Sequence, residues 1–334
     1  MRVDAANRSF AALFGASLMA GMFILCGAIG CVLVGLVVAE VATAGIESLS
    51  EGGRWTAAVF VAVVGAGAVV GLCSFARQLS ASRRLARRVS ELSVPVDARV
   101  KAAADRVGMP CDVALVDCKE SFSFAYGALT PRVVISRGLL EQASEDELAA
   151  VLEHERYHVR NLDPLKVLFA RALPPTFFYL PALRLLEQRY VAGRELAADR
   201  LALRRCGLEP LAGALFKVVR GPQWPELGVA AAIGGPELLD VRITQLETGA
   251  EPRLAPISPG RAGATVAGGL VLTGLFVVSV ASFGGLAAVA GDVGPLDLAG
   301  ALVCAVPWAA GGWLGYRRLQ RRTRVKRRIG STTI

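Results

Sequence analysis

The chain contains only two histidines, and they lie four residues apart in the stretch His154-Glu155-Arg156-Tyr157-His158. On a helix, residues at this spacing share one face, so both imidazoles can reach the same ion. Imidazole nitrogens bind zinc at about 2.0–2.1 Å. Glu155 lies one position further round the helix, where it can take a proton from an attacking water molecule. The spacing predicts a zinc site with His154 and His158 as ligands and Glu155 as the catalytic base.

A catalytic zinc ion usually has three protein ligands, and the sequence offers no third histidine. The third ligand must therefore be a carboxylate or a thiolate. Glu195, in the stretch "YVAGRELAADRLAL", is the best candidate. Asp199 follows it by one helical turn and could accept an N–H from a ligating histidine as an outer partner. Asp163 and Glu187 remain as weaker alternatives for the third ligand.

These residues need helices to position them. Ser144 followed by Glu147 forms a capping-box sequence at the head of a predicted helix over residues 145–160. Further helices are expected over 96–107, 189–206 and 237–248, and short strands over 112–117, 121–126 and 132–136. The predicted domain is mainly helical, with a small sheet before the histidine-bearing helix.

Four long runs of the chain lack charged residues, although the whole chain has a formal charge of +9 and is 54% hydrophobic. Each run is near or above the roughly 20 residues that a helix needs to cross a bilayer. The runs cover residues 10–39, 55–76, 264–290 and 298–316. We therefore expect a membrane protein with four transmembrane helices.

Arginines follow the second and the fourth run, whereas the segments within each pair of runs are acidic or nearly free of basic residues. By the positive-inside rule, both termini and the central region face the cytoplasm of a bacterial inner membrane. The predicted divisions are two spans in residues 1–76, a cytoplasmic domain in 77–261, two spans in 262–316 and a basic tail in 317–334. Because the basic residues follow membrane spans, we expect anionic lipids rather than nucleic acid as their partners.

The segment over residues 165–186 is apolar but carries Lys166, Arg171 and the prolines Pro174, Pro175 and Pro181. A single crossing here would place His158 and Glu195 on opposite sides of the membrane. We expect helical pieces, broken at the prolines, that lie on the membrane surface or dip into it.

The stretches "SFAYGALTPRVVISRGLL", "EDELAAVLEHERYHVRNLDP" and "RELAADRLAL" together resemble the BlaR/MecR-type antirepressor membrane metallopeptidases over roughly residues 77–249. HtpX-type membrane proteases are related. The resemblance implies a gluzincin fold, with His154, His158 and Glu195 as zinc ligands, Glu155 as general base and acid, and Asp199 as an outer partner.

The resemblance also implies a partner, because signalling members of the family cleave, or trigger cleavage of, a cytoplasmic winged-helix repressor. Antibiotic-sensing members carry a penicillin-binding domain with an S-x-x-K motif, and no lysine here has a serine three residues before it. We therefore expect a separate sensor protein, the lipid phase or the spans themselves to supply any signal, and homo-oligomerisation stays open.

Three functions remain as alternatives: a regulatory endopeptidase for one cytoplasmic substrate, an HtpX-like quality-control protease, and a zinc-stabilised scaffold that does not cut. In either protease, an extended substrate is expected to pair with the edge of the predicted strand over residues 121–126. Tyr157, Tyr190 and Arg194 are open candidates for stabilising the oxyanion.

Overall fold

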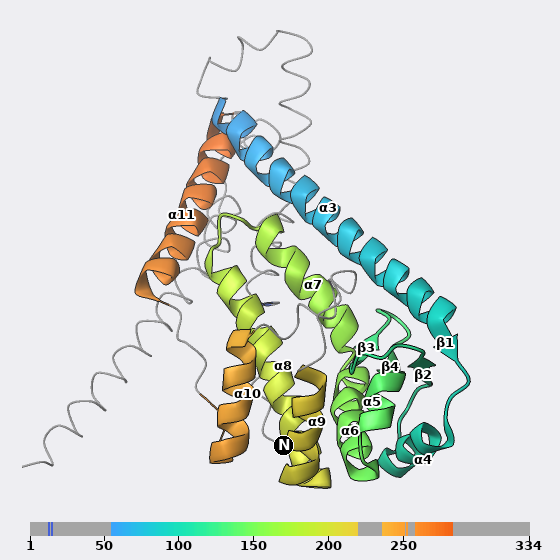
Figure 1. The fold of residues 1–334 in the computed structure, drawn as a ribbon. Helices are drawn as coiled ribbons and strands as arrows, with labels where there is room; N and C mark the ends of the chain where they lie inside the picture. The colour runs from blue at the N-terminus through green and yellow to red at the C-terminus, as the bar shows by residue number, and fades with distance from the viewer. Residues whose placement is uncertain are drawn as a thin grey trace, which may run out of the picture. The chain divides into compact units, whose positions relative to one another are not determined.

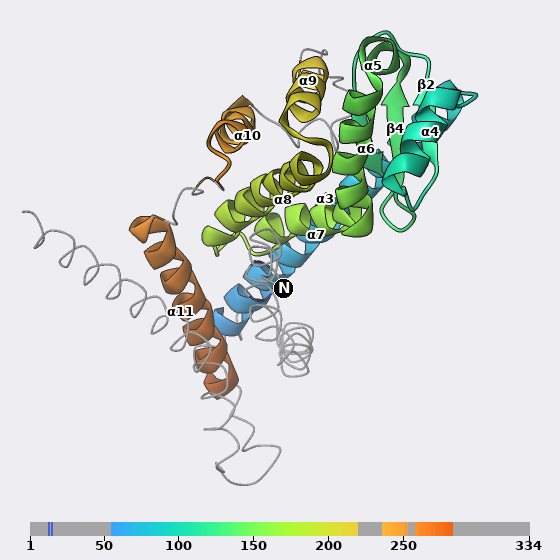
Figure 2. The same cartoon turned by 90° about the horizontal axis from the view of Figure 1, so that it is seen from below.

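The computed structural model describes residues 13, 15, 55–219, 236–250, 252 and 258–282. The chain divides into two compact units. Of the described residues, the first unit contains 13, 70–176, 184–219, 236–250 and 252, with the sheet and the histidine-bearing helix. The second contains 15, 55–69, 177–183 and 258–282. Figures 1 and 2 show the elements of both units in two views. The predicted spans over 10–39 and 298–316 and the tail over 317–334 lie outside the described residues, apart from residues 13 and 15.

The sheet of the first unit is small and mixed, with strand order β1-β2-β4-β3. Strands β2 and β4 are parallel, with Leu115 opposite Ile135, and β3 is antiparallel to β4, with Phe124 opposite Val134. Among the described strands, β3 is therefore an edge strand with one side unpaired. The strands are β1 (Ser93–Val94), β2 (Val113–Val116), β3 (Ser123–Tyr126) and β4 (Arg132–Ser136).

Successive residues of the strands contribute to two different cores, because neighbouring side chains point to opposite faces of a sheet. Val133 and Ile135 pack with helices α4 (Ala98–Val107) and α6 (Glu145–Arg160) in the larger core. Val134 packs on the other face, against Leu85 and Val89 of helix α3 (Trp55–Leu92). The sheet is thus covered by the histidine-bearing helix on one face and by α3 on the other.

The aromatic residues of β3 lie on the α3 face. Phe122 and Phe124 stack with ring centroids 5.7 Å apart, and Phe124 and Tyr126 belong to the same core as Leu85. Gly127, at φ 87°, ends the strand where an added Cβ would lie 2.5 Å from the carbonyl oxygen of Thr130. A side chain at this turn would therefore be strained as well as crowded.

Local sequence signals define α6 at both ends. The predicted capping box is present, with the Ser144 hydroxyl accepting from the Glu147 N–H and the Glu147 carboxylate accepting from the Ser144 N–H. Asn161 caps the carboxyl end, and Leu162 follows in the left-handed region at φ 53°. This tight turn lets the next helix, α7 (Asp163–Thr176), begin at once.

Several boundaries differ from the predicted ones. Helix α7 continues through Pro174 and Pro175 in its last turn, so the break comes after Thr176 and not at the first proline. Helix α8 (Ala182–Cys206) begins directly after Pro181, seven residues before its predicted start. Two helices were not predicted, α5 (Arg137–Gln142) and α9 (Leu208–Val219), whereas α10 (Pro236–Thr248) was.

The second unit contains the first part of α3 and helix α11 (Pro259–Ser282). Phe60 and Phe276 pack with ring centroids 5.5 Å apart, and Leu272 joins them. By length and composition alone, one helix of the described residues, α3, could cross a membrane. It contains the predicted span over 55–76, and α11 covers the first part of the run over 264–290.

Candidate metal centre

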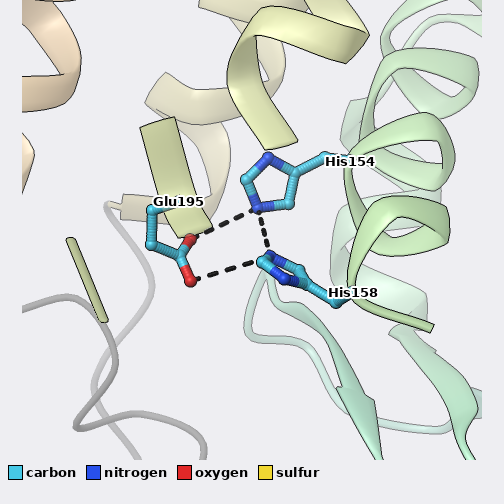
Figure 3. Close-up of side chains that lie close together, drawn as sticks. All are labelled: His154, His158 and Glu195. Carbon is cyan, nitrogen blue, oxygen red and sulfur yellow. Dashed lines mark hydrogen bonds and ion pairs between the residues drawn. The ribbon is translucent and has the colours of Figure 1, made fainter. Parts of the chain in front are cut away.

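The site is formed where α6 meets α8. His154 and His158 lie one turn apart on α6, and their Nε2 atoms are 3.1 Å from each other. Glu195 of α8 extends toward both rings, with Oε2 3.4 Å from His154 Nε2 and Oε1 3.6 Å from His158 Nε2 (Figure 3). Each residue offers one ligand atom, and these atoms lie within 4.8 Å of one another. Among the described residues, this trio is the group arranged to hold an ion.

Each histidine has an aspartate on its other ring nitrogen. His154 Nδ1 lies 2.9 Å from Asp199 Oδ1, and His158 Nδ1 lies 2.7 Å from Asp163 Oδ2. A carboxylate at Nδ1 fixes the ring so that Nε2 carries the free lone pair. Asp199 therefore lies where the sequence predicted an outer partner, whereas Asp163, a rival ligand, supports His158 instead. The other rival, Glu187, experiences the charges of Arg171 and Arg184 and lies outside the trio.

The two aspartates are held differently. Asp199 receives two hydrogen bonds of 2.7 Å from the guanidinium of Arg242 on α10, whose Nη1 is also 3.8 Å from Glu195 Oε2. Asp163 accepts one hydrogen bond of 3.2 Å from the Tyr190 hydroxyl. The role of Arg242 was not predicted, because it lies 43 residues after Asp199 on a separate helix. No local spacing pattern relates these two positions.

The three candidates for stabilising an oxyanion occupy different places. Tyr190 is engaged with Asp163, and Arg194 Nη2 lies 3.1 Å from Glu195 Oε1. The ring of Tyr157 meets that of His158 edge-on, with centroids 5.7 Å apart. Arg194 thus contacts a member of the trio directly, whereas Tyr190 contacts the aspartate behind His158.

Buried charge strongly perturbs this site. Burial lowers the pKa of His154, but the contacts with Asp199 and Glu195 outweigh it and raise the pKa to about 10. Burial raises the pKa of Asp199, but the charge of Arg242 and the contact with His154 bring it to about 2. Burial also opposes ionisation of Glu195, whereas the neighbouring His158, His154 and Arg194 hold its pKa well below the ordinary value.

The charges of the site fit a divalent cation. Four buried carboxylates face two guanidiniums, which leaves an excess of two negative charges when both imidazoles are neutral. The raised pKa of His154 has the same origin, since a proton partly offsets this excess. Two imidazoles and a carboxylate are also a donor set typical of catalytic zinc. The carboxylates are Asp163, Glu155, Glu195 and Asp199, and the guanidiniums are Arg194 and Arg242.

Glu155 lies beside the trio on α6 and is 5% exposed. Its Oε1 accepts a hydrogen bond of 2.8 Å from the hydroxyl of Ser123, the first residue of β3. The carboxylate is therefore held between the histidine-bearing helix and the edge strand of the sheet. Sequence patterns did not predict this contact, because the two residues are 32 positions apart.

Known proteins resemble part of the chain. A protease HtpX homolog from Methanothermobacter thermautotrophicus is 32% identical over 96 residues, which cover 28% of this chain and 37% of the relative. Protease HtpX of Stenotrophomonas maltophilia is 40% identical over 88 residues, covering 26% and 30%. Protease HtpX of Alkalilimnicola ehrlichii is 28% identical over 175 residues, covering 47% and 56%. The chain thus spans between about a third and about half the length of these curated relatives.

A family model described as BlaR1 peptidase M56 matches residues 36–246. The match covers more than half of the chain and includes the sheet, α6, α8 and Arg242. The HtpX relatives, the candidate membrane helix α3 and the trio of His154, His158 and Glu195 agree with it. The chain therefore belongs to the BlaR1 peptidase M56 family, a family of membrane metallopeptidases.

Proposed function

We propose that this protein is a zinc-dependent membrane endopeptidase, with His154, His158 and Glu195 as the zinc ligands and Glu155 as the base. The observation that carries the proposal is the convergence of three ligand atoms within 4.8 Å, in a buried site where carboxylates outnumber guanidiniums by two. Asp199 and Asp163 then act as outer partners that orient the two imidazoles.

A zinc ion in this site would polarise the scissile carbonyl and favour deprotonation of the attacking water. Glu155 accepts the proton of that water and delivers it to the leaving amine, as a general base followed by a general acid. Its Oε1 accepts the Ser123 hydrogen bond, and we assign proton transfer to the other oxygen, Oε2. Arg194 and Arg242 keep Glu195 ionised at its ligand position.

The substrate is proposed to bind in extended form along the unpaired edge of β3. This strand ends the sheet order, and its first residue contacts Glu155. A peptide that added a strand here would place its backbone beside the base, and its main-chain hydrogen bonds would depend little on sequence. The aromatic residues of β3 belong to the α3 core and are not needed to bind it.

We further propose four transmembrane helices and a cytoplasmic peptidase domain over residues 77–261, because the arginine-rich segments follow the second and the fourth apolar run. Apolar side chains exposed on the first part of α3, such as Val69 at 62%, and on α11, such as Val271 at 64%, support lipid contact in each helix. The arginines after residue 76 would then lie near anionic headgroups.

For the substrate, we propose a cytoplasmic protein, with a winged-helix transcriptional repressor as the first candidate. The match to the BlaR1 peptidase M56 family supports a regulatory role. The second candidate function is membrane-protein quality control, favoured by the identity to proteins named protease HtpX. Both functions use the same site and differ in the number of substrates.

New protein N-termini in cells expressing the wild type and the Glu155→Gln variant would separate these functions. We expect one Glu155-dependent cut in a cytoplasmic repressor, together with one zinc ion bound by both proteins. Many Glu155-dependent cuts in membrane proteins would instead establish quality control. Equal sets of N-termini under every stress tested, with zinc bound, would contradict the enzymatic assignment and leave a zinc-stabilised scaffold.

A further inference from the structure

The hydrogen bond between Ser123 and Glu155 joins two parts of the molecule with different roles. Glu155 belongs to α6, which is held by its capping box and by the main core. Ser123 belongs to β3, which pairs with one neighbour, β4, among the described strands. An edge strand of four residues with one free side is the less constrained partner. The orientation of the Glu155 carboxylate therefore depends on the position of this strand.

The direction of the Ser123 side chain follows from the alternation along β3. Tyr126 and Phe124 belong to the core on the α3 face, whereas Ala125 packs with the core that contains α6. Ser123 shares the face of Ala125, because residues two apart on a strand point to the same side. Its hydroxyl reaches Glu155 Oε1 at 2.8 Å, from a residue whose backbone pairs opposite Ile135 of β4.

We propose that Ser123 is a positioning residue that couples the binding of an extended substrate on β3 to the orientation of Glu155. The inference rests on the proposed function and deepens it. A peptide paired along the free edge would give β3 a second neighbour and would restrict its motion. Because the Ser123 hydroxyl donates to Glu155, a less mobile β3 would also hold the Glu155 carboxylate in one orientation. Binding energy from substrate residues distant from the cleaved bond would thereby raise kcat as well as lower KM.

The experiment uses the full-length chain in lipid nanodiscs with zinc bound. A bond in β-casein that the wild type cleaves is located first, and nested peptides of about four to about ten residues are made around it. Values of kcat and KM are measured for each peptide with the wild type and with Ser123→Ala, Ser123→Thr and Ser121→Ala. Ser121 is a matched control, because its hydroxyl lies two residues away, is buried and has no hydrogen-bond partner among the described residues.

We expect kcat of the wild type to rise with peptide length and kcat of Ser123→Ala to stay nearly flat. On the longest peptide the loss in kcat should be about 10- to 100-fold, the range for a misplaced catalytic group. Ser123→Thr keeps the hydroxyl, so its kcat should again rise with peptide length. Ser121→Ala should show the same rise in kcat as the wild type. Zinc content should be the same in all four proteins.

Three results would overturn the proposal. One is a wild-type kcat that does not depend on peptide length. Another is a kcat of Ser123→Ala that still rises with peptide length. A third is a kcat that falls in Ser123→Ala and stays equally low in Ser123→Thr. Each of these leaves the endopeptidase assignment intact, because the wild type still cleaves and Glu155→Gln does not. If zinc-loaded wild type cleaves neither β-casein nor any peptide, the proposed function and this inference both fail.

Discussion

Helix α6 buries charged side chains on two sides, and the two sides differ in their balance of acidic and basic groups. On the metal-facing side, His154 and His158 meet Glu195, and acidic groups are in excess. On the far side, Glu153 accepts hydrogen bonds of 2.9 and 3.1 Å from Arg156 Nη1, and Arg205 of α8 approaches it to 3.3 Å. We call Glu153, Arg156 and Arg205 the far-side cluster.

The buried pair of the far-side cluster, Glu153 and Arg156, is neutral, and its second guanidinium, Arg205, is half exposed, whereas acidic groups are in excess on the metal-facing side. Arg156 also donates to the carbonyl oxygen of Gly108, the C-cap of α4, at 3.2 Å. Arg156 thereby connects α6 to α4, and Arg205 connects α6 to α8, so the far-side cluster joins three helices without a bound ligand. On the metal-facing side, two ring nitrogens 3.1 Å apart and a nearby carboxylate leave a negative excess that a cation can neutralise. Buried charge is compensated by arginine side chains in one region and leaves an acidic excess in the other.

The largest expected effect is on metal binding and comes from the metal-facing side. In Glu195→Gln, the anionic ligand is lost, and the dissociation constant for zinc should rise by at least about 100-fold, with cleavage abolished. Competition with a chromophoric chelator measures this constant. The matched change on the far side, Glu153→Gln, should leave zinc affinity within about threefold. A comparable loss of zinc in both variants would contradict the division of roles.

The next effect is on stability and comes from the far-side cluster. In Arg156→Ala, the carboxylate of Glu153, 1% exposed, loses its main partner, and the free energy of unfolding should fall by about 3–5 kcal/mol. Denaturant titration of the zinc-loaded protein in detergent checks this. Replacing both partners, as Glu153→Leu with Arg156→Met, removes the stranded charge and should recover most of the loss. A double variant as unstable as the single one would show that the pair is not the cause.

A smaller effect is expected from the two aspartates behind the ligands. Asp199→Asn and Asp163→Asn each weaken the hold on one imidazole and should raise the dissociation constant for zinc by about 10- to 100-fold. The loss of zinc affinity should be larger for Asp199→Asn. Arg242 then loses the carboxylate that neutralises it, and its buried positive charge, 3.8 Å from Glu195, disfavours a bound cation. Equal rises in the zinc dissociation constant of the two variants, measured by the same chelator competition, would mean that Arg242 has no effect on zinc affinity.

The smallest effect concerns the turn that leads from His158 to Asp163. Leu162 adopts the left-handed region at φ 53° and is 44% exposed, so its side chain adds strain and little burial. In Leu162→Gly, relief of about 1 kcal/mol is partly offset by the greater freedom of glycine in the unfolded chain. Denaturant titration should show a gain of about 0.5 kcal/mol. The same change at Leu129, which has no positive φ, should give no gain.

Local patterns in the sequence predicted much of the region around the trio of His154, His158 and Glu195. The capping box at Ser144, the four-residue spacing of His154 and His158, and the approximate positions of the strands all depend on interactions between near neighbours along the chain. Such interactions have the same geometry in any helix or strand, so they can be inferred from the sequence. The match to the BlaR1 peptidase M56 family agrees with the resemblance noted from the same stretches.

Tertiary structure alone decided which distant groups meet the predicted ones. Asp163 was considered as a ligand but lies behind His158, and Arg242 and Ser123 were not expected at the site. Their positions depend on how α7, α10 and β3 pack around α6, and no spacing along the chain reports that packing. The sequence by itself thus predicted the two imidazoles as ligands and Glu155 as the base, and these roles stay predictions. Packing decided what holds them, because hydrogen bonds to buried carboxylates form between helices and strands that are remote in sequence.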